Sequence, residues 1–334
     1  MHVLITGGAG FIGAHLARHL LGAGHHVALV DDFSRGTDDE TIRTLAGHPR
    51  ATLHTADLTN AQGWSVLPTD VDVVFHLAAI VGVANVLRAA YDVLDRNVRM
   101  TSEALAWVRR QSTPARVVFM STSEVYAGSL QHLSMPIPTP EETPIALPAL
   151  HEPRTSYLLS KLYGEALCHH SGIPFTIVRP HNVYGPRMGD AHVIPQLLRR
   201  AFETPDGGAL AVYSPSHQRT FCHVHDAVRW LAALADAPGA RNGTFNLGTD
   251  GSEVTIAELA ALVCRTVGKS LTVEPRDDTP GSPSRRCPDL TRLRAVTDAL
   301  PLIDLEAGLR DTFAWSRPFF ERGTRTTRDP DTDR

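Results

Sequence analysis

Close to its N-terminus the chain reads Val3-Leu4-Ile5-Thr6-Gly7-Gly8-Ala9-Gly10-Phe11-Ile12-Gly13. The first four residues form a β-rich apolar run, and an amphipathic stretch continues from the glycines to residue 22. The glycines follow the spacing G-x-x-G-x-x-G. In such a turn the first permits a tight bend, the second lets the backbone approach a diphosphate, and the third lets the helix pack on the strand. We therefore predict a dinucleotide-binding turn with cofactor contacts from Gly7, Gly10, Phe11, Ile12 and Gly13.

A second predicted strand, residues 26–31, ends at the acidic pair Asp31 and Asp32. A carboxylate at this position accepts hydrogen bonds from the hydroxyls of the adenosine ribose and repels a 2′-phosphate, so the pair favours NAD over NADP. Arg35 is the competing signal, because a guanidinium is what a 2′-phosphate would bind. The alternative for the two acids is a solvated turn that binds nothing.

Tyr157 and Lys161 are spaced Y-x-x-x-K. Four residues is about one helical turn, so both side chains leave the same face of a helix. A phenol has an ordinary pKa of about 10, and its use as a base near pH 7 requires about 4 kcal/mol of preferential stabilisation of the phenolate. A nearby lysine and a bound nicotinamide cation can supply it. The pair is therefore a candidate catalytic base with its helper, in contact with the cofactor.

Composition limits the classes of protein to be considered. The chain has 334 residues, 43% of them apolar and 20% charged, with no apolar run long enough to cross a membrane. A net charge of −4 gives no reason to expect nucleic acid as a partner. The four cysteines and 17 histidines show no metal-ligand spacing, so reduced thiols and no metal site are expected. Residues 1–20 lack the features of a signal peptide, and a cytoplasmic location is expected.

Strand-like and helix-like segments alternate through the first 180 residues. Predicted strands cover 2–6, 26–31, 51–56, 71–77, 116–121 and 175–180, and predicted helices include 11–22, 93–111 and 156–170. The alternation is typical of the α/β class, here a Rossmann-type doubly wound parallel sheet. Such sheets bind ligands at the carboxyl ends of their strands. Further cofactor contacts are therefore predicted from Asp57, Leu58, Leu77, Ala78 and Ala79.

After residue 180 the alternation loosens, with helices predicted at 192–203, 226–236 and 255–267 and short strands at 210–213 and 244–247. We predict an NAD-binding domain over 1–180, a smaller C-terminal α/β substrate domain over 181–316 with some interleaved elements, and a polar tail without fixed structure over 317–334. Residues 127–156 are rich in proline, which favours a lid or binding loop beside the site over a neutral spacer.

Together these motifs resemble the extended short-chain dehydrogenase/reductases that modify nucleotide sugars. The resemblance covers residues 1 to about 316 and depends on the order of the segments 6–13, 31–34, 57–58, 76–79, 97–98, 121–126, 157 with 161, and 179–187. It implies an enzyme that oxidises a sugar hydroxyl, usually at C4, with NAD and later returns the hydride to the altered sugar. It also implies Tyr157 as the base, Thr122 as its hydrogen-bonding partner, Lys161 as the holder of the nicotinamide ribose, and Asn97 as a cofactor contact.

The resemblance extends to the substrate. Asn182 and Arg219 match family positions that contact the substrate's diphosphate region, although Arg219 could instead be a plain surface arginine. Ser123 and Glu124 follow the predicted threonine, as in the UDP-glucuronate decarboxylases, whereas dTDP-glucose 4,6-dehydratases have an Asp-Glu pair there. The decarboxylases also resemble this chain around Arg286, which implies an arginine near the substrate.

The chemistry after oxidation stays open. The leading prediction is decarboxylation of an NDP-hexuronate such as UDP-glucuronate, in which the 4-keto sugar acid is a β-keto acid and loses carbon dioxide to form an enolate. The alternatives are a UDP-glucose- or UDP-glucuronate-type 4-epimerase and other C5 or C6 chemistry on a 4-keto sugar. A nonenzymatic NAD-sensing regulator is the alternative of another class, disfavoured because Thr122, Tyr157 and Lys161 are all present.

The helices predicted at 93–111 and 156–170 carry apolar residues on more than one face. One face packs on the sheet, which leaves apolar surface to bury elsewhere. Related enzymes pair these helices across a two-fold axis, so the resemblance implies a homodimer.

Overall fold

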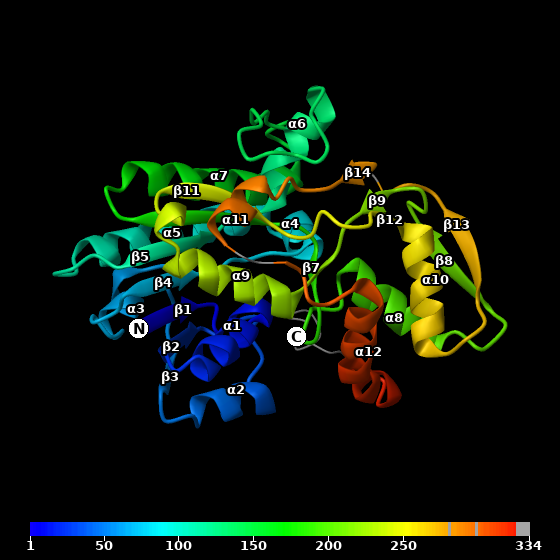
Figure 1. The fold of residues 1–334 in the computed structure, drawn as a ribbon, viewed down its shortest axis with the longest axis horizontal. Coiled ribbons are helices and arrows are strands. Elements are labelled where there is room, and N and C mark those ends of the chain that lie inside the picture. The colour runs from blue at the N-terminus through cyan, green and yellow to red at the C-terminus, as the bar shows by residue number, and fades with distance from the viewer. Residues whose placement is uncertain (280–281, 298–299, 325–334) are drawn as a thin grey trace.

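The computed structural model describes residues 1–279, 282–297 and 300–324. Its centre is a seven-stranded sheet in the order β11-β6-β5-β4-β1-β2-β3, in which every pair is parallel (Figure 1). The strands are β1 (His2–Thr6), β2 (His26–Asp31), β3 (Ala51–Thr55), β4 (Val73–His76), β5 (Arg116–Met120), β6 (Phe175–Pro180) and β11 (Gly243–Leu247). The predicted Rossmann-type fold is confirmed.

Helices cover both faces of this sheet (Figure 1). One face packs against α1 (Phe11–Gly22), α2 (Glu40–Ala46) and α9 (Val224–Asp236). The other packs against α3 (Ala61–Ser65), α5 (Ala90–Arg109) and α7 (Pro153–His170). β1 shows how the sequence builds two cores, because Val3 and Ile5 belong to the first and Leu4 to the second.

A smaller unit has its own apolar core. It consists of α8 (Val193–Glu203), α10 (Ile256–Val267) and α12 (Leu305–Glu321) with the paired strands β8 (Ala209–Tyr213) and β13 (Thr272–Arg276). Two later elements belong to the larger unit: α9 packs on α1, and β11 forms the sheet edge beside β6. The domain boundary at residue 180 stays a prediction.

Short strands lie between the two units. β7 (Val183–Tyr184) pairs with β10 (Cys222–His223), and β9 (Gln218–Arg219) lies between β12 (Val254–Thr255) and β14 (Arg285–Arg286). The remaining helices are α4 (Val83–Arg88), the 3-10 helices η1 (Ser123–Tyr126) and η2 (Pro238–Ala240), α6 (Ala127–His132) and α11 (Thr291–Val296).

The end of the chain differs from the prediction. Residues 317–321, expected in a tail without fixed structure, form the last part of α12. Phe320 holds them in place, since its ring is 4% exposed and lies in the core of the smaller unit. The expectation for residues 325–334 falls outside the described residues. No helix in the described ranges is long and apolar enough to cross a membrane.

The proline-rich stretch is anchored to the body of the protein. Thr139 and Glu141 are 3% and 7% exposed. Ser129, on α6, donates a hydrogen bond to the carbonyl of Pro144 at 2.6 Å. The stretch ends at Pro153, the first residue of α7, where a missing N–H costs no helical hydrogen bond.

Candidate active site

The glycine turn between β1 and α1 forms a cradle that side chains would fill. Gly7 has a φ of 68°, in the left-handed region, and a Cβ on Gly13 would lie 2.2 Å from the carbonyl oxygen of Gly7. Gly10 is the N-cap of α1, and no side chain caps the helix. The N–H groups of the first turn, which Phe11 and Ile12 begin, are therefore free of a side-chain cap and can bind a diphosphate. This geometry fits the diphosphate of NAD.

The two acids after β2 are in different environments. Asp31 is buried, and its carboxylate accepts hydrogen bonds from the N–H groups of Ala9 and Phe33, both at 2.9 Å. Burial raises the pKa of Asp31, while these two bonds act in the opposite direction. Asp32 is exposed and lies 3.6 Å from the guanidinium of Arg96. Asp31 thus ties the end of β2 to the glycine turn, beside the expected position of the adenosine ribose.

The other predicted cofactor residues lie at the same end of the sheet. After β3 and β4 come Asp57, Leu58, Leu77, Ala78 and Ala79. Asn97, on α5, is buried, and its amide exchanges hydrogen bonds with the backbone of Ile80 at 2.7 and 3.1 Å. It therefore shapes the loop after β4. Direct cofactor contacts from all of these residues remain predictions.

Three of the predicted catalytic residues come together at the ends of β5 and α7. The side chains of Tyr157 and Thr122 are hydrogen-bonded to each other. Lys161, one turn further along α7, donates from Nζ to the carbonyl of Met120 at 2.8 Å, and Nζ lies 5.9 Å from the centre of the Tyr157 ring. The carbonyl fixes the ammonium under the phenol.

The expected low pKa of the tyrosine is not a property of the protein alone. Burial raises the pKa of Tyr157 above its ordinary value; the bond with Thr122 lowers it in part, and the charge of Glu124 raises it further. Burial also lowers the pKa of Lys161 to about 8, which weakens its help to a phenolate at higher pH. The lysine alone therefore does not give Tyr157 a low pKa, and the expected contribution of the nicotinamide cation remains a prediction.

Lys161 also affects stability. Its folded-state pKa is about 8 and its unfolded value about 10.4, so between these pH values the unfolded chain binds more protons. The free energy of unfolding should therefore rise with pH in this window, by up to about 1.4 kcal/mol per unit. Urea titrations should show the native free energy rising relative to that of Lys161→Met between about pH 8 and about pH 10. A constant difference would contradict the depressed pKa.

Glu124 forms an ion pair with Arg286, with 2.7 Å between Oε1 and the guanidinium nitrogen. Arg286 is the largest cause of the lowered pKa of Glu124; burial opposes it, and the charges of Arg154 and Arg219 add to it. Glu124 lies in η1, whose first turn is capped by Thr122, and the preceding Ser123 is buried. A carboxylate with an arginine partner thus lies two residues from the threonine that contacts Tyr157.

The other predicted substrate residues are engaged in local bonds. Arg219 donates to the carbonyls of Gln218 at 2.7 Å and Pro283 at 2.5 Å, so its guanidinium holds the turn before β14. Asn182, with a φ of 42°, donates from its side chain to the carbonyl of Thr220 at 2.9 Å. Both lie beside the site, and their contact with a diphosphate remains a prediction.

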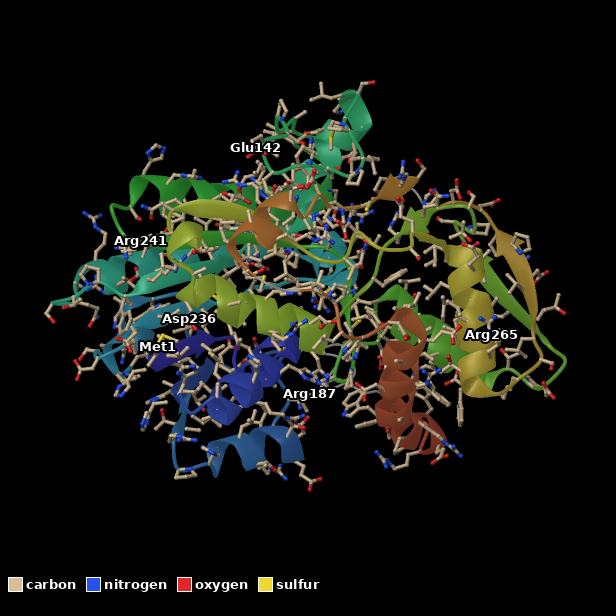
Figure 2. The ribbon with its side chains drawn as sticks, viewed as in Figure 1. Met1, Glu142, Arg187, Asp236, Arg241 and Arg265 are labelled. Atoms are coloured by element: carbon tan, nitrogen blue, oxygen red, sulfur yellow. The ribbon has the colours of Figure 1, made fainter. Side chains whose placement is uncertain are left out.

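Two arginines were not among the predicted site residues. Arg187 is buried between the two units, donates to the carbonyl of Ala9 at 2.9 Å and pairs with Asp39 (Figure 2). Arg187 thus supports the glycine turn although it lies 178 residues away in the sequence.

A guanidinium nitrogen of Arg35 lies 3.8 Å from the position that a Cβ on Gly82 would take. Arg35 thus reaches from the end of β2 to the loop after β4, across β1, and places a cation near the glycine turn. Sequence alone puts Arg35 in a turn and does not show which loop its side chain reaches.

A histidine cluster also formed that spacing alone does not reveal. His223, His225 and Asp311 place potential metal-ligand atoms within 4.8 Å of one another. His223 Nδ1 accepts the N–H of His225 at 3.4 Å, which leaves the ring proton on Nε2, 3.3 Å from the Asp311 carboxylate. The close approach of the His223 ring, just before α9, to the Asp311 carboxylate on α12 therefore accounts for the cluster.

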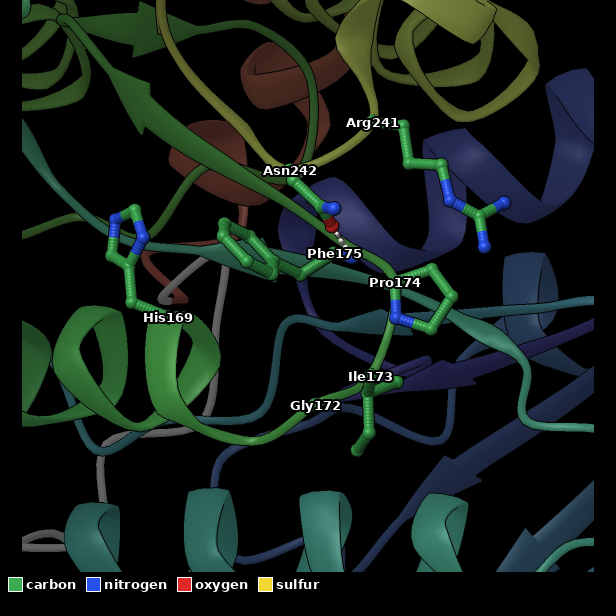
Figure 3. Close-up of a pocket in the computed structure, with 7 residues that line it drawn as sticks. All are labelled: His169, Gly172, Ile173, Pro174, Phe175, Arg241 and Asn242. Atoms are coloured by element: carbon green, nitrogen blue, oxygen red, sulfur yellow. Dashed lines mark hydrogen bonds between the residues drawn. The ribbon is translucent and has the colours of Figure 1, made fainter.

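A surface pocket lies at the opposite, amino end of β6 and β11 (Figure 3). Its lining residues are His169, Gly172, Ile173, Pro174, Phe175, Arg241 and Asn242. None of them is a predicted site residue. The candidate site is therefore the cluster of side chains at the carboxyl ends.

Comparison with known proteins agrees with this site. The NAD dependent epimerase/dehydratase family matches residues 3–248. A UDP-N-acetyl-alpha-D-glucosaminuronate decarboxylase of Bacillus cytotoxicus is 34% identical over 328 residues, covering 94% of this chain and 97% of the relative. UDP-glucuronic acid decarboxylase 5 of Arabidopsis thaliana is 33% identical, covering 92% and 87%. The solved UDP-glucuronic acid 4-epimerase of Bacillus cereus, in complex with UDP-glucuronic acid and NAD, superposes with a TM-score of 0.80 at 25% identity, covering 96% of this chain and 100% of that one. The chain belongs to the NAD dependent epimerase/dehydratase family, and NAD is its cofactor.

Proposed function

We propose that this enzyme decarboxylates an NDP-hexuronate, with UDP-glucuronate as the first candidate substrate. The observation that carries the proposal is the Glu124–Arg286 ion pair, 2.7 Å long, beside Thr122 and Tyr157. An arginine at this place can hold a C6 carboxylate while the phenol faces the C4 hydroxyl. The names of the similar decarboxylases support the same reaction.

The reaction begins at the C4 hydroxyl. Tyr157 takes its proton, with Thr122 as a second hydrogen-bonding oxygen. NAD, when bound, accepts the C4 hydride and later returns it. In the resulting 4-keto acid the C5–C6 bond breaks, its electron pair forms the enolate of C4 and C5, and C6 leaves as carbon dioxide. A proton that comes from water is then added at C5, and the C4 ketone is reduced with return of the Tyr157 proton to the C4 oxygen.

The groups around C5 and C6 have distinct tasks. Arg286 orients the carboxylate, and Glu124, ionised because of its arginine neighbours, takes up a proton from water and passes it to C5. Ser123 is a poor acid, which disfavours loss of water from C6. A 4-epimerase of a uronate remains the second candidate, because the structurally similar Bacillus cereus enzyme also carries a uronate substrate.

Product masses separate these reactions. The purified protein is incubated with UDP-, dTDP-, GDP- and CDP-sugars, including UDP-glucuronate, and the masses of the products are measured by mass spectrometry. Loss of carbon dioxide from a uronate is expected. An unchanged mass with inverted C4 would establish epimerisation instead, loss of water would establish dehydration, and no change with any sugar would favour a nonenzymatic regulator.

The acids after β2 predict the choice of cofactor. NAD should bind at least about tenfold more tightly than NADP, because a carboxylate beside the ribose repels a 2′-phosphate. Asp31→Asn and Asp32→Ser are titrated calorimetrically with both cofactors. The variant at the acid that contacts the ribose should show a smaller difference between its affinities for NAD and NADP. Equal affinities in the native protein would assign the site to Arg35.

We also propose a homodimer through α5 and α7. Apolar side chains remain exposed on and beside these helices, including Tyr91 at 76%, Leu87 at 58% and Tyr163 at 46%. Burial of such a surface against a second copy would stabilise both. Light scattering at micromolar concentration should give the mass of two chains, and the mass of one would refute the proposal.

A further inference from the structure

Arg286 lies on a strand of two residues, which by itself fixes little. β14 pairs with β9 on one side only. On the other side, the chain just after Arg286 is held by the proline-rich stretch. The N–H of Thr139 donates to the carbonyl of Cys287, and the N–H of Asp289 donates to the carbonyl of Thr139, both at 2.9 Å.

Asn246 of β11 is hydrogen-bonded both to the proline-rich stretch and to the chain just after Arg286. Its Nδ2 donates to the carbonyl of Thr139 at 2.9 Å and to that of Asp289 at 3.2 Å. Its Oδ1 accepts from the hydroxyl of Tyr126 at 3.0 Å and lies 3.2 Å from Nε2 of His181. The side chain is fully buried, so each bond is costly to lose.

The bond to Tyr126 continues the network to the other half of the ion pair. Tyr126 is two residues after Glu124, at the end of η1. Its hydroxyl accepts from Arg179 at 2.7 Å, and Arg179 makes a two-pronged pair with Glu165 of α7 at 2.9 and 2.6 Å. One amide thus connects the turn that carries Glu124, the strand that carries Arg286 and, through the buried pair, the helix that carries Tyr157.

We propose that Asn246 is a positioning residue that, with the anchored proline-rich stretch, holds Arg286 opposite Glu124. The proline-rich stretch then serves as a fixed support for the arginine and not as a lid. The consequence for recognition rests on the proposed function: the register of Arg286 determines how well the enzyme distinguishes a uronate from a neutral sugar. The bonds inside the protein can be tested without any substrate.

Asn246→Asp is the decisive variant. It keeps the shape but replaces the two donated bonds by an oxygen facing two carbonyls. Hydrogen-exchange mass spectrometry should show at least about tenfold faster exchange in peptides covering 136–143 and 285–290, and unchanged exchange in the glycine turn, residues 7–13. Asn242→Asp is the matched control, because Asn242 flanks the other end of β11 and its acceptor bond to the N–H of Phe175 is kept. Unchanged exchange in Asn246→Asp would overturn the proposal.

Affinity for two probes tests the effect on recognition. The native protein should bind UDP-glucuronate more tightly than UDP-glucose in calorimetric titrations, and Asn246→Asp should lower that ratio at least about tenfold while UDP-glucose affinity is kept. A purely structural role would weaken both alike and overturn the positioning role. Tyr126→Phe, which removes only one hydroxyl, should lower the ratio of UDP-glucuronate to UDP-glucose affinity to a smaller extent. If Asn246→Asp does not fold, this variant tests the positioning role in its place. A native protein without preference would contradict the proposed function, and hydrogen exchange would still decide the role of Asn246.

Discussion

Replacing Tyr157 by Phe is expected to lower turnover by about 10²- to 10⁴-fold, the usual contribution of a general acid or base. The variant removes only the phenol oxygen, which Thr122 contacts in the structure. The ring stays between α7 and the end of β5, so the cradle for the cofactor is unchanged. Cofactor affinity, measured by titration calorimetry, should therefore remain close to that of the native protein.

A second tyrosine on the same helix provides the control. Tyr163 also belongs to α7, but its side chain is 46% exposed, whereas the predicted catalytic group Tyr157 contacts Thr122. Tyr163→Phe should turn over at the native rate. Native turnover in Tyr157→Phe would show that the phenol is not the base, whatever the behaviour of the control.

Replacing Glu124 by Gln should stop the reaction after oxidation. The amide keeps the shape and can still accept a hydrogen bond from Arg286, but it has no charge and cannot take up a proton from water and pass it to C5. We expect a 4-keto sugar to accumulate and the complete reaction to fall by about 10²-fold or more. Trapping with borodeuteride followed by mass spectrometry would identify the keto sugar.

This result separates the two leading reactions. In a simple 4-epimerase the hydride leaves and returns at one carbon, and Tyr157 handles the only proton. A carboxylate near C5 then has no task, so normal turnover of Glu124→Gln to a C4 epimer of unchanged mass would replace decarboxylation by epimerisation. Glu142→Gln is the control, because Glu142 is exposed at the surface and pairs only with Arg292 among the described residues (Figure 2).

The pH dependence of the Glu124 step has a defined sign. The arginine neighbours lower the pKa of Glu124, so the carboxylate is ionised at neutral pH and stays so as the pH falls toward its ordinary value. We therefore expect a loss of activity on mild acidification to come from protonation of Tyr157, whose pKa burial raises, and not from Glu124. The site thus lowers the pKa of Glu124 and raises the pKa of Tyr157.

Local sequence pattern was sufficient for a large part of this protein. The apolar run before the glycines, the spacing of those glycines, and the one-turn separation of Tyr157 and Lys161 each depend on neighbours within a few residues. The alternation of strands and helices then implies a parallel sheet with its ligands at the carboxyl ends. These features predict the cofactor turn and Tyr157 at the same edge of the sheet, and the structure has both at the carboxyl ends of its strands.

The remaining features depend on contacts between distant parts of the chain. Glu124 meets Arg286 across 162 residues of sequence, and Asn246 meets Thr139 across 107. β11 pairs with β6 in the sheet, although the first elements of the smaller unit come between these two strands in the sequence. The pKa of Tyr157 rises because of burial, which no spacing of residues expresses. Periodicity specifies which face of an element is apolar, whereas the order of strands and the packing of loops arise from the free energy of the whole fold, and these set which charged groups meet in the site.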